Sequence, residues 1–289
     1  MTSTLPPLGP LPAPRSLDLD TMQVAFVDQQ PAASGPPIVL LHGGALDHRM
    51  WAAQLGALPG RRVLAPDARG HGWSRSPDTS YRLCDDVVAL LDALGIGAAV
   101  LVGLSMGGGT AVDVALEYPD RVSGIVVSGT GTSEPEFRDP WVLDLLATWQ
   151  RTQEAGDAEG WIEAFMAFVP GPHRALTDVD PEVTRQVEQM VRDTLANHLV
   201  LDEAGMPVPP ARPTPVAGTW ARLSDIGVPV LAVVGGIDGD DHLRMARTLA
   251  DSVPHGRLVV VDDTAHYPNM ERPEAFNAAV GEHLATWRL

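Results

Sequence analysis

The chain has 289 residues, of which 45% are hydrophobic and 20% charged, so it can bury the large core of an ordinary globular protein. Its 37 acidic residues outnumber 20 basic ones, all of them arginine, and the net charge of −17 disfavours nucleic acid and anionic membranes as partners. The single cysteine, Cys84, excludes an internal disulfide and gives no sign of an oxidising compartment.

The N-terminal segment, residues 1–15, is rich in proline and lacks the apolar stretch of a secretory signal. No apolar run along the chain approaches the ~18 residues that a membrane-spanning helix needs. We therefore expect a cytoplasmic protein.

Short apolar segments alternate with amphipathic ones along most of the chain. The predicted strands are residues 38–42, 62–66, 98–104, 124–128, 228–235 and 257–261. The predicted helices are residues 47–58, 81–94, 106–118, 241–253 and 273–287. The strands are nearly continuous in Val, Leu, Ile and Ala, which is typical of parallel strands buried on both faces. This alternation predicts a doubly wound, mostly parallel α/β sheet, and residues 17–28 are a candidate antiparallel edge strand.

Residues 131–222 interrupt this alternation. No strand-like run occurs there; residues 141–154, 158–169 and 181–198 have helical patterns, and a proline-rich loop follows at 206–215. Ligands of open α/β sheets bind at the carboxyl ends of the strands, where an insertion between two strands covers them. We therefore predict an α/β core formed by residues 1–130 and 223–289, with residues 131–222 as a helical lid.

The predicted lid is rich in aromatic residues. They are Phe137, Trp141, Trp149, Trp161, Phe165, Phe168 and Trp220. Some should form the lid's own core, and others should line an apolar substrate pocket. Trp141, Trp149 and Phe165 are the candidates for the pocket.

The segment Gly103-Leu104-Ser105-Met106-Gly107 joins a predicted strand to a predicted helix. In this context G-x-S-x-G places the serine on a tight, strained turn, where its neighbours two positions away must be small. Gly103 and Gly107 meet that demand. The sequence therefore predicts Ser105 as a nucleophile, with the N-terminus of a helix beside it to favour negative charge.

A serine nucleophile needs a base, and His266 is the candidate because it follows the strand 257–261 at the carboxyl edge of the sheet. His255 precedes that strand, and His283 lies within the last predicted helix. The acid should follow the preceding strand, where Asp238 is the first carboxylate.

Two further carboxylates stay open as the acid. Asp240 and Asp241 lie directly after Asp238, although Asp241 is equally suited to capping the next helix.

The turn His42-Gly43-Gly44-Ala45 after the first parallel strand is a candidate oxyanion hole. The backbone N–H of Met106 is one expected donor and that of Gly44 the second, with Ala45 as an alternative. We expect His42 to brace this loop rather than to take part in chemistry.

Taken together, these motifs resemble the α/β-hydrolase superfamily, in its lidded branch of carboxylesterases, enol-lactonases, cofactor-free haloperoxidases and C–C bond hydrolases. The resemblance runs from about residue 20 to the end, the lid excepted. It rests on H-G-G at 42–44, D-A-R-G-H-G-W-S at 67–74, G-L-S-M-G at 103–107, G-G-I-D at 235–238 and A-H-Y-P-N-M-E-R-P-E-A-F at 265–276. It implies the α/β-hydrolase fold, a Ser-His-Asp triad and structural roles for Asp67 and Arg69. Serine at the elbow departs from the haloalkane dehalogenases and epoxide hydrolases, which have aspartate there.

The expected activity is hydrolysis of a small hydrophobic ester, thioester or lactone through an acyl-enzyme. The alternatives are C–C bond hydrolysis, perhydrolysis, a non-hydrolytic acyl transfer or cyclisation, and a receptor that binds without turnover. We expect no metal and no organic cofactor, because the sequence has neither metal-ligand spacing nor a dinucleotide fingerprint. Monomer and homodimer both stay open.

Overall fold

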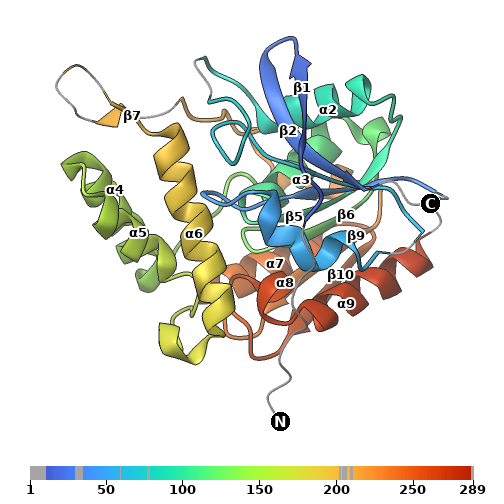
Figure 1. Ribbon diagram of the computed structural model, residues 1–289. Helices are drawn as coiled ribbons and strands as arrows, with labels where there is room; N and C mark the ends of the chain where they lie inside the picture. The colour runs from blue at the N-terminus through green and yellow to red at the C-terminus, as the bar shows by residue number, and fades with distance from the viewer. Residues whose placement is uncertain are drawn as a thin grey trace.

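The computed structural model describes residues 11–29, 35–58, 60–76, 79–201, 203, 207–208 and 211–287. Its main feature is an eight-stranded sheet with the order β1-β2-β4-β3-β5-β6-β9-β10 (Figure 1). The strands are β1 (Arg15–Leu19), β2 (Met22–Gln29), β3 (Ile38–Leu41), β4 (Val63–Pro66), β5 (Ala99–Leu104), β6 (Val122–Ser128), β9 (Val230–Gly235) and β10 (Gly256–Val261). From β4 to β10 all neighbours pair in parallel, so the predicted mostly parallel sheet is confirmed.

The antiparallel edge is a hairpin rather than the single strand that the pattern of residues 17–28 indicated. Strands β1 and β2 pair with each other, and β2 pairs antiparallel with β4. Asp20 and Thr21 form the turn between them. Aspartate favours turns because its side chain hydrogen-bonds nearby backbone groups. The turn at Asp20 therefore divides the predicted strand into two strands.

Helices cover both faces of the sheet, which makes it doubly wound. On one face pack α1 (Ala52–Leu55) and α9 (Pro273–Thr286), preceded by the short α8 (Pro268–Glu271); on the other pack α2 (Leu83–Ala93), α3 (Met106–Glu117) and α7 (Asp240–Ser252). Successive strand residues face opposite sides of the sheet: Leu40 belongs to the core cluster that includes α9, and Leu41 to the one that includes α3.

The helix predicted over residues 47–58 is shorter than expected. The chain forms one 3₁₀ turn, η1 (His48–Trp51), and then the single turn of α1. Asp47 caps the start by accepting the backbone N–H of Arg49, and Gly56 ends the helix. Glycine is a poor helix residue, so the amphipathic pattern beyond it did not extend the helix.

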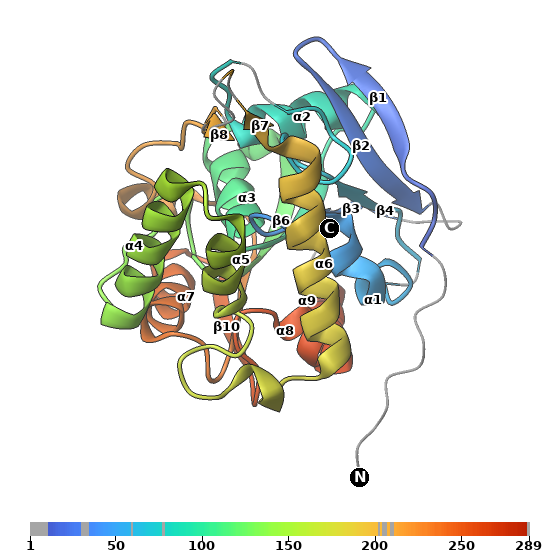
Figure 2. The ribbon, with the colours of Figure 1, turned by 60° about the vertical axis from the view of Figure 1, so that its left-hand side comes forward.

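Three helices lie between β6 and β9 in the chain, as predicted: α4 (Pro140–Ala155), α5 (Ala158–Met166) and α6 (Pro181–His198). They group together on one side of the sheet (Figure 2). The expectation that this insertion holds no strand was wrong, because β7 (Val200–Leu201) pairs antiparallel with β8 (Pro207–Val208). Strands of two residues are too short to produce a periodic pattern in the sequence. Within the described residues, no helix is both long and apolar enough to cross a membrane.

Candidate active site

Ser105 occupies the turn between β5 and α3 with φ 54° and ψ −116°, a conformation that a residue with a side chain rarely adopts. The crowding predicted around it is severe. A Cβ on Gly103 would lie 2.1 Å from the carbonyl oxygen of Gly107, and a Cβ on Gly107 would lie 2.1 Å from that of Leu41. Both positions therefore admit only glycine, and the turn holds Ser105 in its strained geometry.

His266 and Asp238 meet at the carboxyl edge of the sheet, on the loops that follow β10 and β9. The Nδ1 atom of His266 lies 3.0 Å from Oδ2 of Asp238, and both side chains are buried. The loops can approach this closely because residue 235 is a glycine. A Cβ there would lie only 2.1 Å from the carbonyl oxygen of Ala265. Of the three candidate acids, the structure brings Asp238 to this histidine.

The other two carboxylates lie elsewhere. Asp240 is exposed at the start of α7. Asp241 accepts the backbone N–H groups of Arg138 and Asp139, at 2.5 and 2.6 Å, and so holds the segment before α4 rather than capping α7.

Gly129, just after β6, lies against both Ser105 and His266. Its φ is 92°, and a Cβ there would sit 3.0 Å from Cε1 of His266 and 3.3 Å from the backbone nitrogen of Ser105. Gly129 is therefore a small neighbour of both the His266 imidazole and the Ser105 backbone. Gly129 was not among the predicted site residues, although a glycine directly after a buried strand is a signal for close backbone approach.

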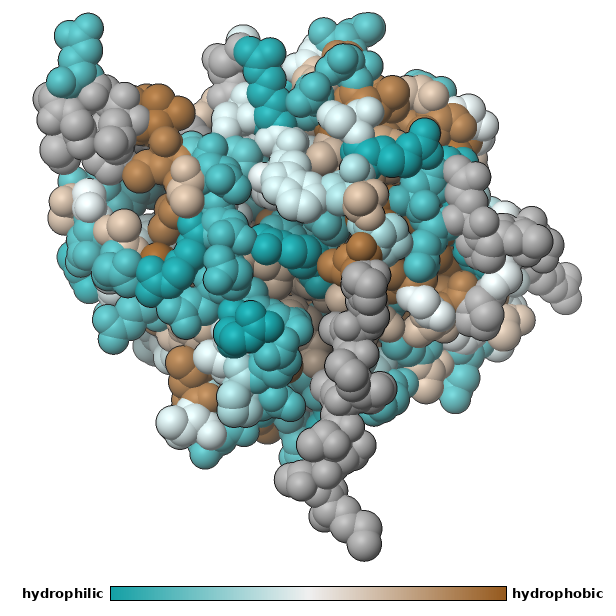
Figure 3. Space-filling model, viewed as in Figure 1, coloured by the Kyte–Doolittle hydropathy of each residue, from teal (hydrophilic) through white to brown (hydrophobic). Residues whose placement is uncertain are grey.

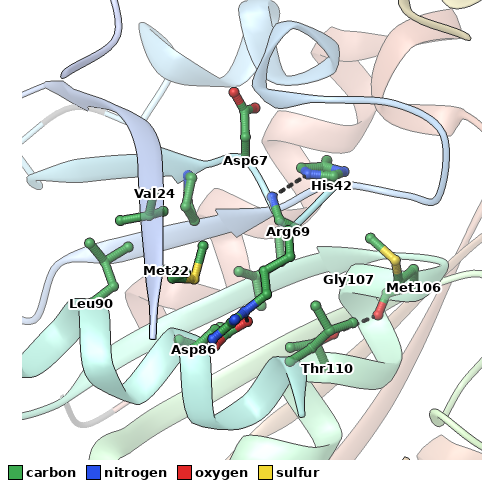
Figure 4. A pocket seen from close by; sticks show the side chains of 15 residues that line it. Met22, Val24, His42, Asp67, Arg69, Asp86, Leu90, Met106, Gly107 and Thr110 are labelled. Carbon is green, nitrogen blue, oxygen red and sulfur yellow. Dashed lines mark hydrogen bonds and ion pairs between the residues drawn. The ribbon is translucent and has the colours of Figure 1, made fainter. Parts of the chain in front are cut away.

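The loop after β3, the candidate oxyanion loop, is held by two hydrogen bonds of His42. Ala68 donates its N–H to Nε2 of His42 at 2.8 Å (Figure 4), so the ring proton is on Nδ1 and is donated to the carbonyl oxygen of Gly43, also at 2.8 Å. All described peptide bonds are trans, which turns the N–H of Gly44 away from His42. The N–H of Met106 stands at the free N-terminus of α3.

The charge state of the site suits proton transfer. Burial lowers the pKa of His266, and the attraction of Asp238 only partly opposes this. Burial acts to raise the pKa of Asp238, but the neighbouring His242 and His266 outweigh it and hold that pKa well below its usual range. The arrangement therefore combines a neutral imidazole with an ionised carboxylate behind it, as a general base requires.

Phe168, in the turn that follows α5, brings the insertion to the site. Its ring centroid lies 5.6 Å from that of His266 and 5.7 Å from that of Trp141. Trp149 and Phe165 pack together at 5.4 Å in the aromatic core of the insertion. The sequence did not single out Phe168, because periodicity does not tell which aromatic residue faces the sheet.

A cavity of about 300 Å³ opens between the insertion and the loops after β3 and β4. Its apolar lining residues are Ala45, Ala158, Trp161, Leu195, Leu199 and Val208. Trp161 thus lines it, rather than Trp141, Trp149 or Phe165, whose place in a substrate pocket stays a prediction. Ala45 is the neighbour of Gly44, so this cavity reaches the candidate oxyanion loop.

An ion pair ties the insertion to the loop that carries His266. Glu271 accepts the backbone N–H of Ala265 at 2.9 Å, and its other oxygen binds Arg174 from the insertion. Arg174 also donates to the carbonyl oxygens of Val169, Pro170 and Asp263. No local pattern indicates this pair, because its members lie far apart in the chain.

Replacing Arg174 with alanine should lower the free energy of unfolding by about 3 kcal/mol at pH 7, because a buried carboxylate loses its counter-charge. Burial already raises the pKa of Glu271, and losing the cation would raise it further. The folded variant then binds a proton more readily than the unfolded chain, so the deficit should shrink between pH 7 and pH 5. Urea denaturation at both pH values measures it.

The matched control is Arg185→Ala, which removes an arginine that pairs with Glu182 on the exposed face of α6. Its denaturation midpoint should match that of the wild type. An equal loss in the two variants, or a loss from Arg174→Ala that does not change with pH, would contradict the buried-pair explanation.

Two compact groups of buried histidine and carboxylate side chains occur in the described part of the chain. They are Asp238, His242 and His266, and Asp47, His48 and Asp67. Each histidine already engages an aspartate through its Nδ1 atom. Hydrogen bonding accounts for both groups, and we assign a metal to neither.

The sheet order, the strained serine turn and the His–Asp pair at the carboxyl edge define an α/β-hydrolase architecture. The chain matches the family model of the alpha/beta hydrolase fold over residues 36–273, and it belongs to that family.

Three similar proteins illustrate the range of the family. The 3-oxoadipate enol-lactonase 2 of Acinetobacter baylyi is 27% identical, in an alignment covering 86% of this chain and 88% of that protein. The 2-hydroxy-6-oxononadienedioate/2-hydroxy-6-oxononatrienedioate hydrolase of Burkholderia vietnamiensis is 31% identical over 86% of both chains. A solved thermophilic esterase from Thermogutta terrifontis superposes with a TM-score of 0.75 at 26% identity, covering 95% of this chain and 100% of that one.

Proposed function

We propose that the protein is a serine hydrolase that cleaves a small hydrophobic ester, thioester or lactone, with Ser105, His266 and Asp238 as its triad. The observation that carries the proposal is the buried hydrogen bond between His266 and Asp238 beside a serine held at φ 54°. A strained serine at the start of a helix, next to an oriented neutral imidazole, is the arrangement of an activated nucleophile.

In this mechanism Ser105 attacks the acyl carbonyl while His266 takes the proton from its hydroxyl group. The N–H groups of Gly44 and Met106 hold the oxyanion of the tetrahedral intermediate. His266 then gives the proton to the leaving group, which departs and leaves the acyl-enzyme. Water attacks the acyl-enzyme by the same route and releases the acid.

The apolar cavity beside Ala45 supports a hydrophobic substrate. Leu199 and Val208 line it and are 44% and 41% exposed, so part of its lining is exposed hydrophobic surface. Figure 3 shows brown, hydrophobic atoms at the upper left, where Figure 1 places β7 after α6. We accordingly propose that residues 131–222 act as a lid over the core, with Phe168 closing over His266.

A C–C bond hydrolase on the same triad is the second candidate. Its support is the Burkholderia vietnamiensis relative, whose name describes a dienedioate hydrolase. Rates of product formation on ester, lactone and vinylogous diketone substrates would distinguish the two activities.

The test is reaction with a fluorophosphonate probe, read by intact mass and peptide mapping. The wild type should gain one adduct at Ser105. Ser105→Ala should gain none, and His266→Ala should react at least about 1,000-fold more slowly because the serine has lost its base. An unlabelled, folded wild type, or an adduct that persists in Ser105→Ala, would contradict the proposal.

A further inference from the structure

Asp238 has two histidine partners, and only one of them, His266, takes part in the proposed mechanism. Its Oδ2 faces Nδ1 of His266 at 3.0 Å, and its Oδ1 faces Nδ1 of His242 at 2.8 Å. The backbone N–H of Gly239 also donates to Oδ1, at 2.8 Å. The two imidazole centroids are 4.4 Å apart, and His242 is only 1% exposed. An ionised carboxylate can only accept, so both histidines carry a proton on Nδ1.

We propose that His242 is a positioning residue that holds Asp238 through the carboxylate oxygen that does not face His266 and draws on the same carboxylate charge, so that it sets the pH at which His266 begins to act as a base. This role rests on the proposed function and deepens it with a residue that lies outside the triad. His242 would not touch the substrate. It would act on the reaction only through Asp238 and His266.

The positioning follows from the two oxygens of the carboxylate. His242 and Gly239 both bond Oδ1, so rotation of the carboxylate would break two hydrogen bonds. With Oδ1 fixed, Oδ2 is directed at His266. The rings of Phe137 and Phe168 lie 5.9 and 6.3 Å from that of His242 and help to keep this region dry, where electrostatic interactions are strong.

The charges around His242 favour its protonated form. Burial acts to lower its pKa, but Asp238, followed by Asp241 and Asp139, outweighs burial and raises it. Asp238 comes from the loop after β9, Asp241 from α7 and Asp139 from the start of α4. His266, from the loop after β10, is a titratable neighbour with its ring centroid 4.4 Å away.

The order of proton uptake follows from these charges. As the pH falls, His242 takes up the first proton, and its positive charge then opposes a second proton on His266. His266 therefore stays neutral, and able to accept the proton of Ser105, at a lower pH than a simple Asp–His pair would allow.

His242→Asn tests this role, because asparagine keeps a hydrogen-bond donor for Asp238 but cannot become charged. We would measure the rate of fluorophosphonate labelling of Ser105 from pH 4 to pH 9. The acid limb of the pH–rate profile is the range where labelling slows because His266 becomes protonated. In the variant this limb should move to higher pH by about one unit, so that at a pH on the limb the variant reacts about tenfold more slowly than the wild type. Its rate on the plateau should stay close to that of the wild type.

Two further variants separate charge from structure. His242→Phe keeps a ring but removes the donor, so the plateau itself should fall at least about tenfold as Asp238 loses its orientation. His255→Asn changes an exposed histidine before β10 and should leave both limb and plateau unchanged. A purely structural role of His242 would lower the rate of His242→Asn equally at every pH, with the limb in place, and would overturn the proposal.

A second measurement does not depend on activity. In the Ser105→Ala background, NMR of the imidazole groups should show His242 gaining its proton at higher pH than His266. The reverse order would overturn the proposal. If the wild type is not labelled at any pH, the proposed function fails, and the NMR order then decides only which of the two histidines takes up a proton first. If labelling is normal and His242→Asn keeps the wild-type limb, only the role of His242 fails.

Discussion

Asp238→Asn is expected to lower kcat by about 10⁴-fold while leaving the protein folded. The carboxylate accepts hydrogen bonds on both oxygens, from His266 on one and from His242 and Gly239 on the other. An amide has one oxygen, and turning it toward the two donors places its NH₂ group against His266. The ring proton of His266 would then move to Nε2, the nitrogen that must accept the proton of Ser105. Steady-state kinetics on an ester, with circular dichroism to verify folding, measures the effect.

Asp240→Asn is the matched control, because it makes the same chemical change two residues away on an exposed side chain. It should keep nearly full activity. This pair of variants also decides the alternative that the sequence left open. Loss of activity in Asp240→Asn with retention in Asp238→Asn would show that the acid has been assigned to the wrong residue.

Gly107→Ala should destabilise the fold by about 3 kcal/mol or more. The new Cβ would lie 2.1 Å from the carbonyl oxygen of Leu41 and 2.7 Å from that of His42, and backbone atoms cannot rotate away as a side chain can. Relief requires α3 to move away from β3, which would also displace Met106. Urea denaturation should show a lower midpoint, and probe labelling should be slowed in the fraction that remains folded.

The control substitution is Gly281→Ala in α9, where an added Cβ meets nothing within 4 Å. Alanine has the higher helix propensity, so this variant should be as stable as the wild type or more stable by up to about 1 kcal/mol. Equal midpoints for Gly107→Ala and the wild type would show that the turn is looser than its geometry indicates.

Much of the fold was predictable because buried parallel strands have a strong local signature. The runs 38–42 and 98–104 became β3 and β5 almost unchanged, and G-x-S-x-G placed Ser105 at the end of β5. Chain order and the position of the loops were enough to bring His266 and Asp238 to the same edge.

The remaining features of the site depend on contacts that no local pattern encodes. Phe168 is one aromatic residue among several in the insertion, and which of them faces His266 depends on how α5 packs. The pair of Arg174 and Glu271 joins segments almost a hundred residues apart. His242 left no comparable signal, because it lies in the first turn of α7 whereas Asp238 lies in the loop before that helix.

The candidate site is complete only after distant segments of the chain have folded together. Its parts come from the loops after β3, β5, β6, β9 and β10, so no short contiguous stretch of the sequence contains it. Parallel neighbours such as β6 and β9 pair across the whole insertion, and such non-local contacts form slowly because a long loop must close first. Ser105 and His266 become neighbours only when this pairing is complete. Catalytic competence is therefore a property of the finished sheet, and its recovery on refolding would report the last steps of assembly.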